Sequence, residues 1–137
     1  MTTTQSEAET TALGRDLGRE LSAGAVVLLE GPLGAGKTAF ARGLAEGLGC
    51  DPGDVSSPTF TIIHEYAGRI PLQHVDLYRL TETEVDDLGL EDLMEDAVLA
   101  IEWPDRWRQA PAGAVVVAIE PAGEGRRRVR IDRHSTR

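Results

Sequence analysis

The chain has 137 residues, room for one domain with a modest core, and its 41% hydrophobic and 27% charged residues are typical of a globular protein in water. Its formal net charge of −9 disfavours autonomous nucleic-acid binding, which depends on neutralising phosphates. No apolar run approaches the ~20 residues that cross a bilayer, no secretory signal begins the chain, and a lone Cys50 excludes an intramolecular disulfide. We expect a cytoplasmic protein with a single domain over residues 1–137, a frayed end at 1–6 and a tail at 133–137.

Residues 7–21 predict an amphipathic helix, because apolar side chains recur there at helical spacing. That stripe comprises Ala8, Leu13, Leu17 and Leu21. An apolar run at residues 25–30 follows, with the length and branching of a buried parallel strand. Residues 37–48 then predict a second helix, which places Phe40, Leu44 and Leu48 on one face.

Between that strand and the second helix lies Gly31-Pro32-Leu33-Gly34-Ala35-Gly36-Lys37-Thr38, which fits the P-loop pattern of Gly, four residues and Gly-Lys-Thr. The glycines let successive backbone N–H groups turn toward one anion, and the start of the helix adds its dipole. We expect Lys37 to reach the β- and γ-phosphates and the Thr38 hydroxyl to bind Mg²⁺. Lys37 is the only lysine among the 14 Lys and Arg residues, which supports the motif.

Residues 55–66 predict a loop leading into a strand, and residues 70–76 predict its partner in a β-hairpin. Within the loop, Ser57-Pro58-Thr59-Phe60-Thr61 lies where a switch segment would enter a P-loop site, so hydroxyls such as that of Thr59 are candidates to sense a γ-phosphate. A plain connection into a strand fits the same pentapeptide equally well.

Thr81 and Glu84 have the spacing of a capping box, so short helices are expected to follow. Two uniformly apolar runs, 97–101 and 115–119, and a further strand at 129–131 complete the pattern. With no internal repeat or linker, we predict an α/β fold: a P-loop NTPase-like three-layer sandwich with a mostly parallel central sheet plus an antiparallel hairpin.

A P-loop site also needs an acid at the end of a neighbouring strand, to hold Mg²⁺ directly or through water. Glu102 ends an apolar run typical of a central parallel strand, whereas Asp76 ends a mixed run closer to an edge or hairpin strand. We favour Glu102 for the metal and Asp76 for a supporting role, with a surface acid as the plain alternative for each.

Trp103 is interpreted as a core residue rather than an interface plug. His64 and His74 are interpreted as structural, because no Cys or acid stands at ligand spacing from them.

The choice of nucleotide is partly settled by composition. The chain contains no asparagine and its one lysine is in the P-loop, so the Asn-Lys-x-Asp motif that reads guanine is absent and ATP is favoured.

Charge is distributed unevenly, with eleven acids and one base at 76–105, and six arginines and one acid from 126 to the end. The acidic stretch is either a solvated helical face, which we favour, or a docking surface for a basic partner.

Four segments resemble the bacterial TsaE (YjeE) family in order and spacing, and the match runs from Thr10 to Ile131. They are Leu33 to Thr38, Ser57-Pro58-Thr59-Phe60, His74 to Leu80, and Ile101-Glu102-Trp103-Pro104. The resemblance implies an Mg²⁺-dependent ATPase of the tRNA threonylcarbamoyladenosine pathway, which acts with the partner proteins TsaB and TsaD. TsaD would carry the transferase chemistry on tRNAs that read codons beginning with A, and ATP hydrolysis here would reset or activate the TsaB–TsaD complex.

By the same resemblance, Lys37 acts in phosphate binding and catalysis, Thr38 and Glu102 bind the metal, and Asp76 assists. Thr10 matches a family position near the nucleotide. An arginine before the last strand also matches, where Arg126, Arg127 and Arg128 compete and Arg127 is our candidate. The predicted nucleotide-binding set is therefore Thr10, Leu33, Gly34, Ala35, Gly36, Lys37, Thr38, Thr59 and Arg127.

Two other functions stay open from the residues alone. A small-molecule kinase shares the strand–loop–helix start, although its usual arginine-bearing lid would fall where this chain is acidic. A nucleotide-gated binding module without useful catalysis is the other.

Overall fold

The computed structural model describes residues 2–32, 36–51, 63–108 and 110–133. Within these ranges the chain forms a seven-stranded sheet in the order β1-β7-β6-β2-β5-β4-β3. The elements in chain order are β1 Thr2–Thr4, α1 Glu7–Glu20, β2 Val26–Glu30, α2 Lys37–Gly47, β3 Ile63–Tyr66, β4 Leu72–Asp76, α3 Glu82–Asp87, α4 Leu90–Leu93, β5 Val98–Glu102, a 3₁₀ helix at Pro104–Arg106, β6 Val115–Pro121 and β7 Arg127–Arg133.

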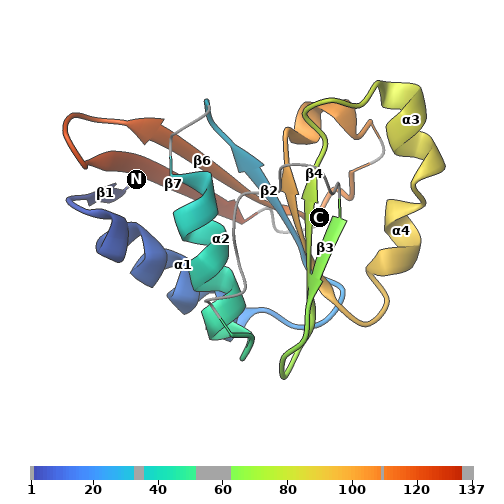
Figure 1. Cartoon of the computed structure of the whole chain (residues 1–137), viewed down its shortest axis with the longest axis horizontal. Helices are drawn as coiled ribbons and strands as arrows, with labels where there is room; N and C mark the ends of the chain where they lie inside the picture. The colour runs from blue at the N-terminus through green and yellow to red at the C-terminus, as the bar shows by residue number, and fades with distance from the viewer. Residues whose placement is uncertain (1, 33–35, 52–62, 109, 134–137) are drawn as a thin grey trace.

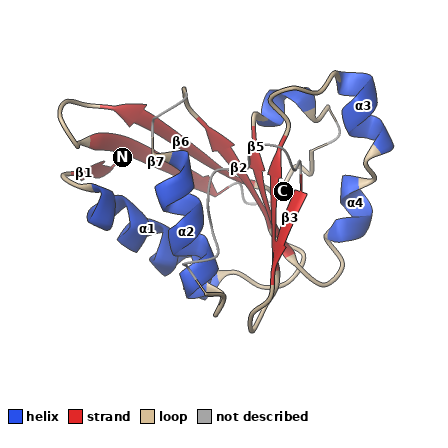
Figure 2. Ribbon diagram, in the orientation of Figure 1, coloured by secondary structure: helices blue, strands red, loops and turns tan. Residues whose placement is uncertain are grey.

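The centre of the sheet is parallel, with β2 between β5 and β6 and with β4 beside β5. The predicted hairpin is present as the antiparallel pair β3–β4, and a second antiparallel pair joins β6 to β7. Helices cover both faces, so the predicted α/β three-layer architecture is confirmed (Figures 1 and 2). Because parallel strands end at one edge, the carboxyl ends of β2, β4 and β5 lie side by side.

Each face of the sheet has its own apolar core. On one face, α1 and α2 pack side by side over a cluster that includes Leu29, Phe40 and Leu44 (Figure 1). On the other face, α3 and α4 contribute Val85 and Leu90 to a second cluster. Phe40, Leu44 and Leu48 are all fully buried, as the helical spacing predicted, and each such side chain stabilises the fold by roughly 1.5–3 kcal/mol.

The contact between α1 and α2 is made by glycines on both helices. A Cβ placed on Gly14 would lie 2.2 Å from the carbonyl oxygen of Phe40, and one on Gly43 would lie 2.0 Å from that of Thr11. Gly18 and Gly47, one turn further along, are equally close to the opposite backbone. The predicted apolar stripe on α1 is therefore largely right: Leu17 is buried and Leu13 and Leu21 pack against the core, whereas Ala8 is exposed. The close contact with α2 is made by the glycines.

The first strand corrects an expectation. Residues 1–6 were expected to fray, but Thr2–Thr4 form β1 and pair antiparallel with β7, Thr4 opposite Arg127. The Thr4 hydroxyl is buried and lies 2.7 Å from the Thr10 hydroxyl of α1, which ties the strand to the helix. At the other end, Arg133 closes β7, and residues 134–137 of the expected tail lie outside the described residues.

The capping box at Thr81 and Glu84 is present in both directions: the Thr81 hydroxyl accepts from the Glu84 amide, and the Glu84 carboxylate accepts from the Thr81 amide. It begins α3 where the sequence predicted. In the part of the chain that the structure describes, no helix has the length and apolar character needed to span a bilayer.

Candidate nucleotide-binding site

The P-loop connects the carboxyl end of β2 to the start of α2. Leu33, Gly34 and Ala35 lie outside the described residues, as does Thr59 with the rest of 52–62. Gly36, which precedes α2, has φ 105°, a left-handed conformation that favours glycine. Its carbonyl accepts the hydrogen bond from the Phe40 amide that starts the helix. The predicted strand–loop–helix setting of the motif is therefore present around the undescribed residues.

Lys37 is buried at the first position of α2, with its side chain 4% exposed. Its ammonium donates a hydrogen bond of 2.8 Å to the carbonyl oxygen of Gly31 and lies 3.8 Å from the Glu102 Oε1 atom. It also lies 4.3 Å from the centroid of the Trp103 ring, within cation–π range. A lysine ammonium has three N–H donors. The bond to Gly31 holds the side chain in place, and the remaining donors can bind an incoming anion.

Glu102 ends β5 and is buried at 7% exposure. It stands in register with Leu29 of β2 and with Asp76 of β4, so its carboxylate lies at the edge where the P-loop leaves the sheet. A buried carboxylate is costly unless it is paired, and Lys37 and His74 flank this one. The sequence-predicted pair of Lys37 and Glu102 is thus brought together from positions 65 residues apart.

Asp76 is half-buried beside Glu102 on the neighbouring strand. Its Oδ1 atom accepts a hydrogen bond of 2.9 Å from the Tyr78 amide, which fixes the carboxylate at the turn after β4. Thr38 follows Lys37 in the first turn of α2. Among the described residues no cluster of three or more His, Cys, Asp or Glu side chains is arranged to hold a metal. A magnesium site that uses one or two protein ligands together with phosphates does not require such a cluster.

Trp103 is half-buried rather than a plain core residue, and its φ of 61° is the one positive value at a non-glycine position in the ranges described. The left-handed backbone costs roughly 1–2 kcal/mol and turns the ring toward the ammonium of Lys37. Its ring lies 4.9 Å from that of Tyr78, centroid to centroid. Together with Gly31 and Pro32, Trp103 borders a hollow of about 480 Å³ next to the P-loop.

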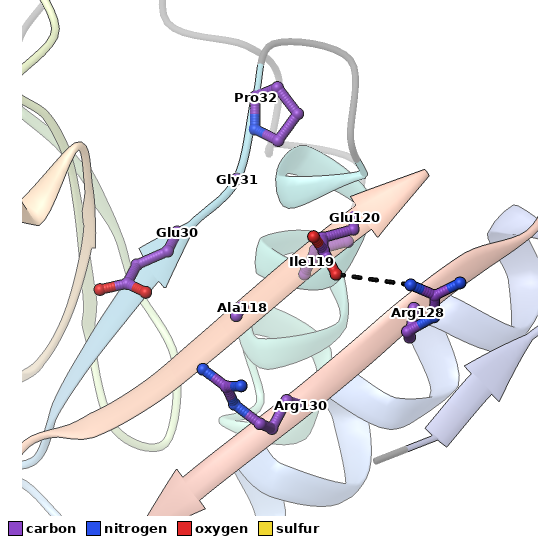
Figure 3. A pocket seen from close by; sticks show the side chains of 8 residues that line it. All are labelled: Glu30, Gly31, Pro32, Ala118, Ile119, Glu120, Arg128 and Arg130. Carbon is purple, nitrogen blue, oxygen red and sulfur yellow. Dashed lines mark ion pairs between the residues drawn. The ribbon is translucent and has the colours of Figure 1, made fainter. Parts of the chain in front are cut away.

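Arg127 is the arginine that lies against the P-loop. A Cβ placed on Gly36 would stand 3.2 Å from its Nε atom, so Gly36 leaves the room that this side chain occupies. Arg128 points to the opposite face of β7, where it lies 3.8 Å from Glu120, its register partner on β6. Both residues line a hollow of about 270 Å³ between β2, β6 and β7 (Figure 3). That hollow contains neither Lys37 nor Glu102. The alternation of β7 separates Arg127 from Arg128, because Arg127 shares its face with buried Val129.

Thr10 lies on α1 with its hydroxyl 2.7 Å from the Thr4 hydroxyl and 3.3 Å from the Ser6 carbonyl oxygen that it donates to. Because Thr4 pairs with Arg127, this threonine supports the strand from which Arg127 reaches the P-loop. A role of Thr10 in nucleotide binding therefore stays a prediction.

The described residues fit a magnesium-bound nucleotide. Gly36 has the backbone that a tight anion-binding turn requires, Lys37 supplies a buried positive charge, and Glu102 and Asp76 supply oxygen ligands of the kind magnesium prefers. One residue was missed by the sequence interpretation: His74 contacts Glu102 through its Nε2 atom, 2.7 Å from Oε2. No local spacing could have indicated this contact, because the two residues are 28 positions apart on different strands.

A lysine at the start of the helix after β2 and an acid at the end of the adjacent parallel strand meet at one edge of the sheet, which is the arrangement of a P-loop nucleotide-binding protein. Comparison with known proteins narrows the class. The family model described as "Threonylcarbamoyl adenosine biosynthesis protein TsaE" matches residues 4–129. The chain belongs to the TsaE family.

Individual relatives agree with this assignment. The chain is 46% identical over 125 residues to the tRNA threonylcarbamoyladenosine biosynthesis protein TsaE of Nostoc sp., covering 87% of this chain and 76% of that protein. It is 38% identical over 130 residues to the protein of the same name from Treponema pallidum, covering 93% and 96%. A crystal structure of Bacillus subtilis YdiB superimposes with a TM-score of 0.76 at 35% identity, covering 93% of this chain and 80% of that one.

Proposed function

We propose that this chain binds ATP with Mg²⁺ and hydrolyses it slowly, as a cytoplasmic subunit required for threonylcarbamoyladenosine modification of tRNAs that read codons beginning with A. The observation that carries the proposal is the buried Lys37 ammonium, held by the Gly31 carbonyl and 3.8 Å from Glu102. The names of the TsaE relatives supply the pathway.

In this proposal the backbone of residues 33–36 and the Lys37 ammonium hold the phosphates, and Thr38 and Glu102 bind the metal. Asp76 orients water or a metal-bound ligand from the next strand. Bound magnesium neutralises charge on the phosphate oxygens and so supplies the electrophilic chemistry. Arg127 adds positive charge beside Gly36 of the P-loop. Thr10 and Thr59 complete the nucleotide contacts.

The chain would work with TsaB and TsaD rather than transfer the threonylcarbamoyl group itself. Hydrolysis would reset or activate the TsaB–TsaD complex, and tRNA would be reached only through that complex. The net charge of −9 supports an indirect contact, because a protein that binds nucleic acid on its own neutralises phosphates with positive charge. Slow turnover in isolation is expected where a partner completes the site.

Reconstitution tests the proposal. TsaB and TsaD are supplied with tRNA and the threonylcarbamoyl donor, with and without this chain and ATP, and modified adenosine is measured. The wild-type chain should stimulate repeated modification only when ATP is present, and Lys37→Ala should abolish the stimulation. Modification that is the same with and without the chain would overturn the proposal.

A second measurement separates an ATPase from a nucleotide-gated module. Glu102→Gln keeps the size of the side chain and removes its charge. We expect it to suppress phosphate release and tRNA modification together. Modification that persists while phosphate release is lost would assign the chain to the gated module.

A further inference from the structure

His74 occupies an unusual place for a histidine. It is 0% exposed in the middle of β4, a strand that has neighbours on both sides. Its register partner on β5 is Ala100, and Glu102 stands two residues further along the same face of that strand. Because Ala100 has only a methyl side chain, the imidazole has room to extend across it toward the carboxyl edge of the sheet.

Among the residues that the structure describes, the imidazole makes one hydrogen bond, and it is to the acid of the P-loop site. Its Nε2 atom lies 2.7 Å from Glu102 Oε2, while the other carboxylate oxygen, Oε1, lies 3.8 Å from the Lys37 ammonium. The two oxygens therefore have different partners. His74 holds Oε2 through its hydrogen bond, and Oε1 is left near the Lys37 ammonium of the P-loop.

The surroundings of the ring also assign its tautomer. A carboxylate only accepts, so in the bond to Glu102 the Nε2 atom is the donor that this proposal requires. The Nδ1 atom is buried and has no hydrogen-bond partner among the described residues. In the neutral ring with hydrogen on Nε2, the Nδ1 atom is a bare acceptor.

We infer that His74 is a positioning residue of this site, which holds the Glu102 carboxylate in the orientation that directs Oε1 toward the magnesium of the bound nucleotide. The inference rests on the proposed function, because it assumes that Glu102 is a metal ligand. Ligands to metals are commonly oriented by a second hydrogen bond, and losing that bond typically lowers metal affinity about 10–100-fold.

Without the His74 bond, the Glu102 carboxylate is free to turn and to pair more closely with Lys37. That would weaken the metal site. The effect should therefore be seen as a change in how strongly magnesium favours nucleotide binding, rather than only as a loss of stability.

The test measures the affinity for ATP by calorimetry over a range of magnesium concentrations and again with the metal chelated. In His74→Leu, which removes the donor and keeps an apolar side chain of similar size, the gain in affinity that magnesium gives should fall about 10–100-fold. The affinity measured without magnesium should stay as in the wild type. His74→Gln, whose amide can donate from a similar place, should restore most of the gain.

His64→Leu is the matched control, because His64 lies directly opposite His74 on β3 and makes no contact with Glu102 in the described structure. It should leave the magnesium dependence unchanged. A folded His74→Leu protein with wild-type magnesium dependence would overturn the inference. If the wild type itself gains no affinity from magnesium, it is the proposed function that fails.

A second readout does not depend on the variants folding. Nitrogen-15 NMR of the nucleotide-free wild-type protein distinguishes the two tautomers of His74. Hydrogen on Nε2, with a resonance that shifts in Glu102→Gln, supports the inference. Hydrogen on Nδ1 alone, with none on Nε2, would overturn it.

Discussion

Gly43 on the P-loop helix α2 presses directly against the backbone of Thr11 on α1: a Cβ at Gly43 would stand only 2.0 Å from the Thr11 carbonyl oxygen. Gly14, Gly18 and Gly47 repeat this close approach along the same pair of helices. The two helices therefore lie so close together that only glycine fits at these four positions. Through this contact, α1 fixes the position of α2, the helix that begins with Lys37.

The first prediction follows from this contact between α1 and α2. Gly43→Ala should destabilise the fold by at least the roughly 1–3 kcal/mol typical of overpacking, although alanine is intrinsically better than glycine in a helix by about 1 kcal/mol. Urea denaturation measures the change. An unchanged unfolding midpoint would show that the helices can separate without cost. Ala8→Gly on the exposed face of α1 is the control and should cost only about 1 kcal/mol.

Lys37→Arg should lower ATP affinity roughly 10–150-fold, the equivalent of a charged hydrogen bond of about 1.5–3 kcal/mol. The ammonium fits between the Gly31 carbonyl, Glu102 and the Trp103 ring, a space that a planar guanidinium exceeds. Calorimetry with ATP and magnesium measures the loss. Arg42→Lys, the reverse exchange on the same helix, should have no effect on binding, and a similar loss there would point to a general disturbance of α2.

The two neighbouring acids should differ in their effects. Glu102→Gln is expected to abolish the gain in nucleotide affinity that magnesium provides, whereas Asp76→Asn should reduce it less. The asparagine keeps the oxygen that accepts from the Tyr78 amide, so the turn after β4 is preserved. The opposite ranking of the two variants in a magnesium titration would make Asp76 the direct ligand.

Arg127 and Arg128 form a matched pair for mutation. Arg127→Ala should weaken ATP binding, because that side chain lies against Gly36 of the P-loop. Arg128→Ala should not, because Arg128 lies near Glu120 on the other face of the sheet (Figure 3). Equal losses in both variants would mean that net charge, rather than the placement of Arg127, governs affinity.

An exposed ion pair between the ends of α1 and β7 should give a measurable pH effect. Arg133 lowers the pKa of Glu20 below its ordinary 4.5, first by a hydrogen bond and then by its charge. A lowered pKa in the folded state means that the pair stabilises the protein above pH 4.5 and that this contribution is lost as the pH falls below it. The stability difference between wild type and Glu20→Gln, followed by urea denaturation, should be present at pH 7 and shrink in acid.

The sequence interpretation succeeded where local patterns carry the information. Uniform apolar runs marked β2, β5 and β6, and the Thr81–Glu84 spacing marked the start of α3. It also selected Lys37 and Glu102, because a P-loop demands an acid at the end of a nearby strand. These features depend on side-chain period and motif, and both can be read within a few residues.

Other features depend on pairing across the sheet or between helices. Residues 1–6 were expected to fray because they lie at the end of the chain, and only the pairing of Thr2–Thr4 with β7 makes them a strand. The sequence interpretation of α1 rested on its apolar stripe, and only the approach of α2 shows the function of its glycines. Arg127 was one of three candidates, and counting alternate positions from buried Val129 would have separated it from Arg128.

The pairing of β1 with β7 also constrains the order of events during synthesis. Arg127, the partner of Thr4, leaves the ribosome more than a hundred residues after it. The contacts between β1 and β7 are therefore far apart in sequence, and the two strands cannot pair in a nascent chain that stops before Arg127. The arginine beside the P-loop therefore reaches its place only after nearly all of the domain has emerged.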